Sequence, residues 1–263
     1  MKFESVNRQG QNQLFKRLVH FPGQQVSYIQ NPKVASTSFV LMLWRRHDPA
    51  NSPINPHGRS HDQRPFPRTI RDFDVSLVPE LLASQFFSAV RNPYHRFLSA
   101  YLNKVRHPTR WGKIARRVGF SNAEEQPSFE HFIDVVTTLD PFEIDHHFRP
   151  QHINLLNGFL PVDRLGSLEN LADLSHFLQL NGFALGRDDE NRTNAGSRID
   201  EFITPRLAVR LARYYEADFL IYGYSDDIRE KGQVRAPDIS SDRTALRTFL
   251  ESDMFIKRAR ASG

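Results

Sequence analysis

Short apolar runs and amphipathic stretches alternate along most of the chain, and the two clearest strand patterns are each followed by a loop and a helix. Residues 25–30 predict a strand that ends at Asn31-Pro32, and residues 39–46, which are apolar from Phe39 to Trp44, predict the next helix. Residues 85–90 predict a second buried strand, after which Pro93 suits the first position of a helix. Repeated strand–loop–helix units predict an α/β fold with a central parallel sheet.

The remaining pattern shows no internal repeat and no interdomain linker, and it predicts one helix-rich domain over residues 1–263, with its core at about 25–225. Further helices are expected at residues 77–82, 128–139, 168–180, 204–218 and 241–254, and a short strand at 163–167. Ser128 and Thr204 are expected to cap helix N-termini, and Gly182 to end a helix in the left-handed conformation. No regular pattern is seen at 107–126 or 140–160.

Residues 47–71 form an irregular loop rich in Pro, Asn, His and Arg. A loop of this length inside a domain is typical of a lid or a binding loop, and disorder is the alternative. Its histidines, His47, His57 and His61, are better explained by a solvated loop than by a glycan or metal site. At the other end of the chain, residues 240–263 predict a C-terminal helix and a basic tail.

Composition narrows the class of protein. The 263 residues contain no Cys, which excludes a disulfide scaffold, a Cys-ligated zinc site and a thiol nucleophile. No apolar run approaches the roughly 18 residues of a membrane span, and the N-terminus lacks a signal-peptide core. We therefore expect a cytoplasmic protein, with peripheral membrane attachment left open. The formal charge of +5 indicates an anionic partner without choosing between nucleic acid, membrane and phosphorylated small molecule.

The loop after the first strand has the chemistry of a phosphate site. A helix begins there, and its first backbone N–H groups attract anions. The candidate anion ligands are Lys33, Val34, Ala35, Ser36, Thr37 and Ser38. Small residues allow close approach of the backbone, hydroxyls add donors, and Lys33 adds charge. The glycines of a Walker-type nucleotide loop are missing. A hydroxyl-capped helix with Lys33 in solvent is the alternative interpretation.

A second candidate anion site follows the second strand. Arg91 stands at the carboxyl end of this strand, where open parallel sheets bind their ligands. Its guanidinium can donate two hydrogen bonds to a phosphate. Ser99, in the following helix, can offer its hydroxyl to the same anion. The alternative is that Arg91 pairs with a carboxylate while Ser99 only packs.

Taken together, these segments resemble the paired motifs of the sulfotransferases that use 3′-phosphoadenosine-5′-phosphosulfate (PAPS). Residues 32–38, PKVASTS, are similar to the 5′-phosphosulfate loop of the carbohydrate branch, and residues 91–101 to the 3′-phosphate motif. Residues 147–151, 163–171 and 214–224 resemble further segments of that branch, so the likeness spans about residues 26–225. Departures include Phe39 and Phe148 in place of Trp and Asn92 in place of Asp. The lack of Cys and of an anchor indicates a soluble, bacterial-like member.

The resemblance implies a P-loop-like three-layer fold with helices on both sides of the sheet. It assigns Lys33 and residues 34–38 to the 5′-phosphosulfate, and Arg91 and Ser99 to the 3′-phosphate. It further implies an O-sulfotransferase that moves a sulfuryl group from PAPS to a hydroxyl of a saccharide, leaving 3′-phosphoadenosine-5′-phosphate (PAP), without a metal.

A base must take the acceptor proton, and histidine suits this near neutral pH. His147 matches the family's histidine, and its neighbour His146 is the second candidate. A purely structural role for either histidine is the alternative. Arg192, in a polar loop, is a further candidate contact to the nucleotide or the acceptor.

Two other functions were weighed from the residues. A kinase-like phosphotransferase that uses a nucleoside triphosphate would need a Walker-type Gly-Lys-Ser/Thr, which is missing. A basic nucleic-acid-binding module would show a continuous basic stripe or stacking aromatics, so no nucleic-acid partner is expected. The basic residues at 106–117 suggest a solvated helix face, with guidance of an anionic saccharide as the alternative. Oligomeric state is left open.

Overall fold

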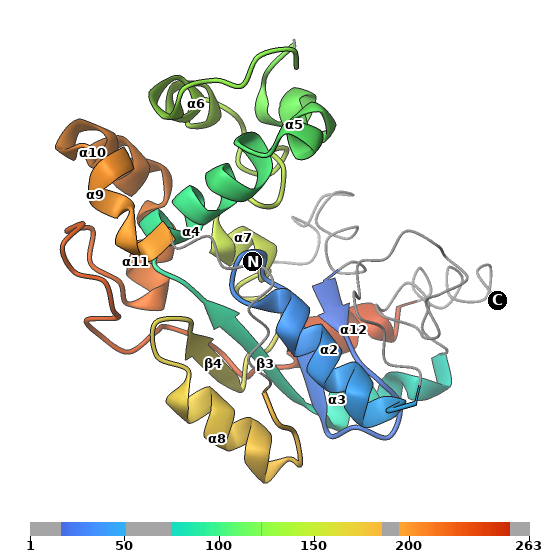
Figure 1. Cartoon of the computed structure of the whole chain (residues 1–263). Coiled ribbons are helices and arrows are strands. Elements are labelled where there is room, and N and C mark those ends of the chain that lie inside the picture. Colours follow the sequence, from blue (N-terminus) through green and yellow to red (C-terminus); the bar gives the residue numbers. More distant parts are fainter. Residues whose placement is uncertain (1–16, 51–74, 122, 186–194, 253–263) are drawn as a thin grey trace.

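The computed structural model describes residues 17–50, 75–121, 123–185 and 195–252. Its sheet contains β1 (Leu18–Val19), β2 (Val26–Ile29), β3 (Gln85–Val90) and β4 (Arg164–Ser167), in that spatial order. Strands β2, β3 and β4 are parallel, as predicted, whereas β1 pairs antiparallel with β2. The two-residue β1 was not expected and makes the sheet mixed (Figure 1). The predicted α/β class with a central sheet is confirmed.

Most of the predicted helices are present, in the predicted order along the chain. They are α2 (Ser36–His47), α3 (Val78–Ala83), α4 (Pro93–Ala100), α5 (Pro108–Ile114), α6 (Phe129–Val136), α7 (Gln151–Asn154), α8 (Ala172–Leu180), α9 (Ile199–Phe202), α10 (Pro205–Tyr214), α11 (Glu216–Tyr222) and α12 (Thr244–Leu250). Within the described residues, no helix has both the length and the apolar composition that a membrane span requires.

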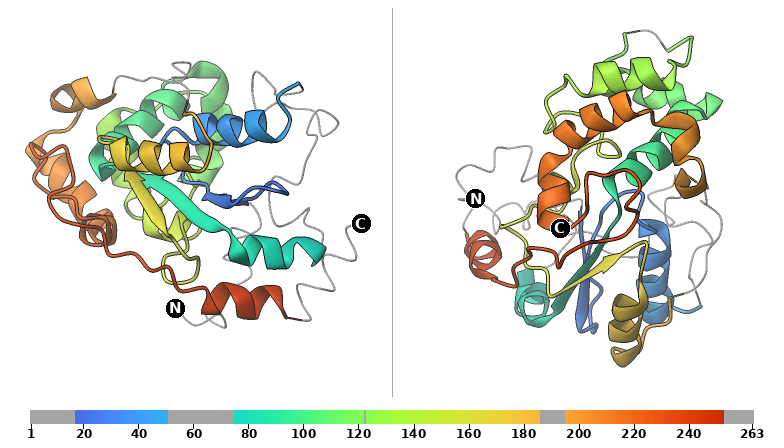
Figure 2. Two further views of the ribbon diagram at one scale, coloured as in Figure 1. Left: turned by 90° about the horizontal axis from the view of Figure 1, so that it is seen from below. Right: turned by 90° about the vertical axis from the view of Figure 1, so that its left-hand side faces the viewer.

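Alternating side chains of the strands divide between two cores. Tyr28, Phe87 and Ala89 face a cluster that includes buried residues of α2 and α8. Ile29 and Val90 belong to the larger cluster on the other face, which includes residues of α3, α4, α10 and α12. Figure 2 shows α2 and α8 on one side of the strands and α3 and α12 on the other. Period-two alternation therefore produces the three layers that the resemblance implied.

Local capping follows the predicted chemistry. The backbone N–H of His131 donates to the Ser128 hydroxyl, and that of Leu207 donates to the Thr204 hydroxyl. Gly182 has a φ of 79°, the left-handed conformation that favours glycine after a helix.

Three predictions of helix extent were wrong, and one of them concerns the segment 140–160, which contains α7 although no regular pattern was expected there. The expected helix at 204–218 is divided at Tyr215, which is fully buried between α10 and α11 and has a φ of −104° and a ψ of 19°. The segment 107–126 contains α5 and a following 3₁₀ turn, although no regular pattern was expected there. Trp111 and Ile114 are buried three residues apart and give α5 its inner face. The outer face of α5 carries basic residues, so its two buried residues alone did not form a recognisable helical pattern in the sequence.

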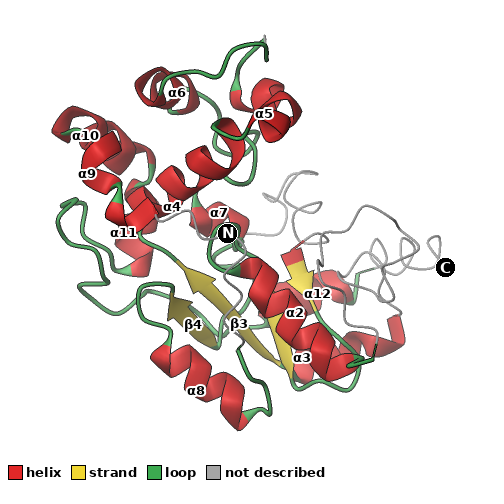
Figure 3. Ribbon diagram, in the orientation of Figure 1, coloured by secondary structure: helices red, strands yellow, loops and turns green. Residues whose placement is uncertain are grey.

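The helices that follow β3 gather beyond the carboxyl ends of the strands. In Figure 3, α4 leads from β3 toward α5, and α6 lies on the same side of α4 as α10, to which it is joined by the ion pairs Glu130–Arg206 and Asp134–Arg210. This arrangement surrounds the ends of β2 and β3, where both predicted anion loops lie. Residues 51–71 of the predicted loop and residues 253–263 of the basic tail lie outside the described residues. The predicted start of this loop at His47 was wrong, because His47 is the last residue of α2.

Candidate functional site

The two predicted anion loops are fastened to each other by one glutamine. Gln151, the first residue of α7, accepts hydrogen bonds from the Asn31 side chain and from the backbone N–H of Arg91, both at 3.0 Å. Its own amide donates to the Arg91 carbonyl at 2.9 Å. Asn31 also donates to the Ala89 carbonyl, across to β3. The ends of β2 and β3 are thereby held in a fixed relation, so ligands of the two loops act at one place.

The loop between β2 and α2 has the backbone of an anion-binding turn. Lys33 and Ala35 both have left-handed backbone conformations, with φ values of 69° and 62°. Alternation of this conformation with the right-handed one forms a concave row of N–H groups, called a nest. Ala35 is the N-cap of α2, and no side chain caps this helix. The loop therefore presents backbone donors at the positive end of a 12-residue helix.

The side chains of this loop have different roles: some pack in the core and some hold the loop in its conformation. Val34 is buried in the core beside α2, so only its backbone can face a ligand. The Ser36 hydroxyl donates to the Asn31 carbonyl and accepts from the Tyr28 hydroxyl, so it holds the loop in shape. Thr37 is half-buried and Ser38 is buried.

Lys33 is half-buried and has no hydrogen bond or ion pair with the residues that the structure describes. Burial, followed by the positive charges of Lys104, Arg91, Arg110 and Arg96, lowers its pKa to about 7. In the part of the chain that the structure describes, several cations therefore converge on Lys33, and no carboxylate is among the charges that act on its pKa. A bound anion would relieve this repulsion and restore the ordinary ionisation of Lys33.

Arg91, at the end of β3, also makes no ion pair with another described residue, although the charge of Glu169 acts to raise the pKa of its guanidinium. Burial lowers the pKa of its guanidinium, and no hydrogen bond or ion pair of this group with another described residue is found. The nearest carboxylate, Glu169, is instead bonded to the Asn92 backbone, the Ser167 hydroxyl and the Tyr224 hydroxyl. The alternative of an Arg91–carboxylate pair is thus not observed in this part of the chain. Ser99 is buried on α4, about two turns further along.

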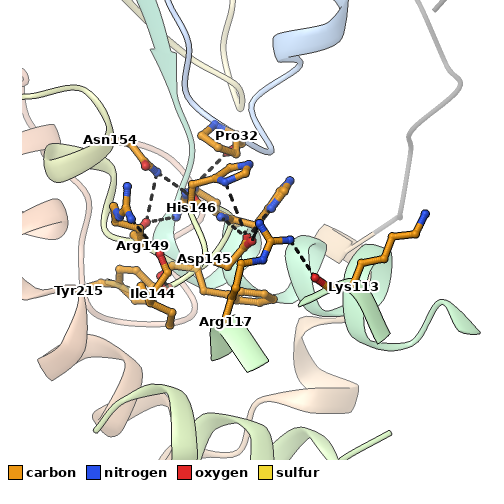
Figure 4. A network of polar contacts seen from close by, with 12 residues as sticks. Pro32, Lys113, Arg117, Ile144, Asp145, His146, Arg149, Asn154 and Tyr215 are labelled. Carbon is orange, nitrogen blue, oxygen red and sulfur yellow. Dashed lines mark hydrogen bonds and ion pairs between the residues drawn. The ribbon is translucent and has the colours of Figure 1, made fainter. Parts of the chain in front are cut away.

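Arg96 connects the first loop to the histidine segment, a role that the sequence analysis missed. Its guanidinium donates to the carbonyls of Pro32 at 3.1 Å, Arg149 at 2.9 Å and His146 at 3.1 Å. The side chain is fully buried. Three backbone acceptors from two distant segments thereby converge on one residue of α4 (Figure 4).

His147 and Asp145 form a tight pair. His147 Nδ1 lies 2.6 Å from Asp145 Oδ1, which also accepts the backbone N–H of His147. The other carboxylate oxygen lies 3.1 Å from a nitrogen of Arg117. A carboxylate on Nδ1 fixes the ring and its tautomer and directs Nε2 outward. His146 lies against His147, with ring centroids 4.0 Å apart and its Nδ1 4.0 Å from Asp145.

Both histidines are kept neutral by their surroundings. Burial lowers the pKa of His147 to about 3, and the charges of Lys104 and Lys33 add to this effect against the opposing influence of Asp145. Burial and the charge of His147 lower the pKa of His146. Although burial raises the pKa of the Asp145 carboxyl, its hydrogen bond with His147 is among the stronger effects that hold it well below its usual range. Neutral imidazole is the form that can accept a proton.

The same three residues have ligand atoms within 4.8 Å of one another, the spacing of a metal site. Their surroundings oppose a cation, because Arg117 already pairs with Asp145 and the charges of Lys33 and Lys104 act on His147. The chemistry of this cluster fits proton transfer better than metal binding.

The predicted site residues act on one another electrostatically. The charge of Arg91 lowers the pKa of Lys33, and the charge of Lys33 lowers the pKa of His147. His146 and His147 both act on the pKa of the Asp145 carboxyl. Arg192 lies outside the described residues, as do His57 and His61. The positioning roles of Arg96, Gln151 and Asp218 were missed. Asp218 of α11 accepts the backbone N–H groups of Gln151 and His152, which caps α7. Each of these three residues lies in a segment of the resemblance, which was the available signal.

Comparison with known proteins agrees with this geometry. No curated protein and no solved structure shows significant similarity to the chain. A family profile described as "Sulfotransferase family" matches residues 16–225, a span that contains both anion loops, the Asp145–His147 pair and the capping Asp218. The match covers most of the chain, which therefore belongs to the sulfotransferase family.

Proposed function

We propose that this protein is an O-sulfotransferase that moves a sulfuryl group from PAPS to a hydroxyl of a carbohydrate or glycoconjugate. The observation that carries the proposal is a pair of cations, Lys33 and Arg91, that follow adjacent parallel strands and make no ion pair with another described residue. PAPS has anionic groups at two separated positions, its 5′-phosphosulfate and its 3′-phosphate. One nucleotide can therefore satisfy both cations.

The assignment of groups follows from position. Lys33 and the backbone of residues 34–38 bind the 5′-phosphosulfate, because the nest and the N-terminus of α2 lie there. Arg91 and Ser99 bind the 3′-phosphate, with Arg91 offering its guanidinium fork. Arg192 remains a proposed contact to the nucleotide or the acceptor.

In the proposed in-line displacement, different residues of the chain serve the leaving group and the acceptor. PAPS, when bound, supplies the sulfuryl group and has PAP as its leaving group. As the acceptor oxygen bonds to sulfur, the bridging S–O bond breaks and its electron pair stays on the 5′-phosphate. Lys33 neutralises the charge that develops there. His147 accepts the acceptor proton at Nε2, Asp145 stabilises the resulting imidazolium, and His146 is the second candidate base.

The low pKa of His147 is consistent with this role once the donor is bound. Part of the depression comes from the charges of Lys104 and Lys33. Anionic groups beside these lysines would offset that potential and raise the pKa of His147 toward its ordinary value. The base would then be strongest when the donor is in place.

The carbohydrate acceptor is supported by the likeness of residues 32–38 to the loop of the carbohydrate branch and by the basic residues of α5 and the turn after it. These residues can attract an anionic saccharide. A transfer assay with labelled PAPS over glycans, lipids and small alcohols tests this part.

The nucleotide is tested by the melting temperature of the protein with PAP, with ATP and Mg²⁺, and with an oligonucleotide. We expect PAP to raise the melting temperature and the other two ligands to leave it unchanged. Stabilisation by ATP and Mg²⁺ without stabilisation by PAP would refute the proposal and favour a kinase-like phosphotransferase.

A further inference from the structure

The side chains of α4 divide between an apolar and a polar side of the helix. The apolar ones belong to the larger core cluster and include Tyr94, Phe97 and Leu98. On the opposite side lie His95, Arg96 and Ser99, which the three- and four-residue spacing of a helix makes neighbours. The Arg96 guanidinium donates to the Pro32 carbonyl at 3.1 Å, so this polar side faces the first anion loop. His95 is therefore next to Ser99 on the side of α4 that borders the proposed nucleotide site.

Contacts with two other segments locate the ring of His95. Its Nδ1 lies 3.8 Å from Glu169 Oε1, the same oxygen that accepts the backbone N–H of Asn92 at 3.0 Å. A Cβ atom at Gly196, just before α9, would lie 3.8 Å from Cε1 and Nδ1 of the ring, so this glycine packs directly against it. Asn92 directly follows Arg91 in the sequence. The ring thus lies beside the backbone that carries Arg91.

His95 is a buried polar side chain without a full partner. It is 5% exposed, and 3.8 Å to Glu169 is too long for a hydrogen bond. Both oxygens of Glu169 are already occupied, one by the Asn92 N–H and the other by the hydroxyls of Ser167 and Tyr224. Neither ring nitrogen of His95 is among the fully enclosed unpartnered atoms of the described residues, so both reach open space. Since Nδ1 is directed at Glu169, Nε2 is left for an external partner.

The charged groups around His95 come from three segments. Burial and the charges of Arg91 and Lys231 lower the pKa of His95 to about 4, while the charge of Glu169 acts in the opposite direction. Lys231 belongs to the loop after α11, and its carbonyl accepts a hydrogen bond from the Asn92 side chain at 3.5 Å. The imidazole is therefore neutral in the free protein near neutral pH, and an anion bound beside it would favour its protonated form.

We propose that His95 is a third ligand of the 3′-phosphate, to which its Nε2–H donates a hydrogen bond beside Arg91 and Ser99. This inference rests on the proposed function and concerns a position that the resemblance leaves unassigned. Arg91 holds the phosphate next to the ring, so His95 contributes to binding only while Arg91 is present. Glu169, on the Nδ1 side, stabilises the imidazolium. Its proton is taken from the solvent, and no covalent bond between heavy atoms changes.

The test compares PAP with AMP, which lacks the 3′-phosphate. Titration calorimetry would measure both affinities in the wild type and in His95→Phe, which keeps an aromatic ring and loses both nitrogens. We expect His95→Phe to weaken PAP binding about 5-fold and AMP binding less than about 2-fold, because a charge-assisted hydrogen bond to the 3′-phosphate is lost.

The same titrations, repeated in buffers of different ionisation enthalpy, give the number of protons taken up on binding. Near pH 7, the wild type should take up more protons with PAP than with AMP, because only PAP protonates His95. Any proton that Lys33 gains beside the 5′-phosphate is common to both nucleotides. His95→Phe should remove the excess. If this variant melts early without nucleotide, the proton uptake of the wild type decides, because it needs no substitution.

Two further variants serve as controls. His95→Gln keeps an amide donor near the position of Nε2, so it should retain PAP affinity within about 3-fold and lose the excess proton uptake. His176→Gln changes an exposed histidine of α8, which packs on the other face of the sheet from α4. It should leave the affinities and the proton uptake unchanged.

Equal proton uptake with PAP and AMP in the wild type, or unchanged PAP affinity in His95→Phe, would overturn the inference and leave the proposed function intact. Equal weakening of both nucleotides in His95→Phe would overturn it as well, because His95 would then support the fold of the site without contacting the 3′-phosphate. Failure of the wild type to bind PAP would instead refute the proposed function, and this inference with it.

Discussion

His20 and His147 are two of the described histidines that are hydrogen-bonded to a carboxylate, and they lie toward opposite ends of the parallel strands. His20 Nδ1 is 2.8 Å from the Ser27 hydroxyl, and its Nε2 is 3.1 Å from Glu80. His147 is bonded through Nδ1 to Asp145. By composition alone, the Ser27–His20–Glu80 chain looks the more catalytic, because it has a serine, a histidine and a carboxylate in sequence.

Their surroundings reverse that impression. His20 is 1% exposed and both of its ring nitrogens have partners, while Ser27 is fully buried and bonded also to the Ser84 hydroxyl at 2.5 Å. The reactive atoms of Ser27 and His20 are therefore enclosed by the folded protein. His147 keeps 16% of its side chain exposed, and the charges of Lys104 and Lys33, which form no ion pair with another described residue, act on its pKa. The comparison teaches that unsatisfied charge and access, rather than residue types, distinguish a reactive histidine from a structural one.

The largest effect is expected for Lys33→Ala. Loss of the charge that neutralises the leaving oxygen should lower turnover about 1,000-fold, because a preorganised donor contributes most in the transition state. Sulfate transfer from labelled PAPS measures this change. Lys113→Ala removes an equal charge from an exposed site and should stay within about 2-fold of the wild type. Similar losses in both variants would mean that only general attraction is at work.

The two histidines should respond differently to substitution. His147→Ala should lower turnover about 100-fold, the usual contribution of a general base, and leave PAP affinity unchanged. His20→Leu should leave turnover per folded molecule unchanged. It should lower the free energy of unfolding by about 1–3 kcal/mol, because Ser27 and Glu80 lose their partner. Denaturant titration measures the free energy of unfolding, and the kinetic assay measures turnover, so the two effects can be separated. If His147→Ala lost stability but kept its turnover, His147 would be a structural histidine like His20.

The smallest effect is on stability in mild acid. Burial lowers the pKa of His20 in the folded protein. The unfolded chain therefore binds more protons as the pH falls below about 6.5, and the free energy of unfolding decreases there. One such histidine contributes at most about 1.4 kcal/mol per pH unit. Urea titrations at several pH values should show a shallower acid slope for His20→Leu, whereas an unchanged slope would mean that His20 is not responsible.

The sequence predicted the architecture well because core positions repeat with the period of their element. The strands at β2 and β3, the caps Ser128 and Thr204, and the two anion loops all depend on neighbours in sequence. The short β1 could not be predicted, because two residues carry no period.

The hydrogen bonds that hold the site together could not be predicted from the sequence for a different reason. Arg96 bonds to carbonyls that lie 50 to 64 residues away, and any residue has a carbonyl, so no pattern marks those partners. Gln151 connects segments 60 and 120 residues distant in the same manner. The π-helical turn Tyr101–Val105, which directly follows α4, also leaves no signal, because these residues continue the apolar spacing of an ordinary helix.

The central claim is that two cations at the ends of adjacent strands bind the two anionic groups of a single nucleotide. Calorimetry with PAP and with AMP, which lacks the 3′-phosphate, tests it most directly in the wild type and in Arg91→Ala. The account predicts that the wild type binds PAP more than about 10-fold tighter than AMP, and that Arg91→Ala abolishes this difference by weakening PAP binding alone. Equal affinity of the wild type for PAP and AMP, or a preference that survives in Arg91→Ala, would contradict the account.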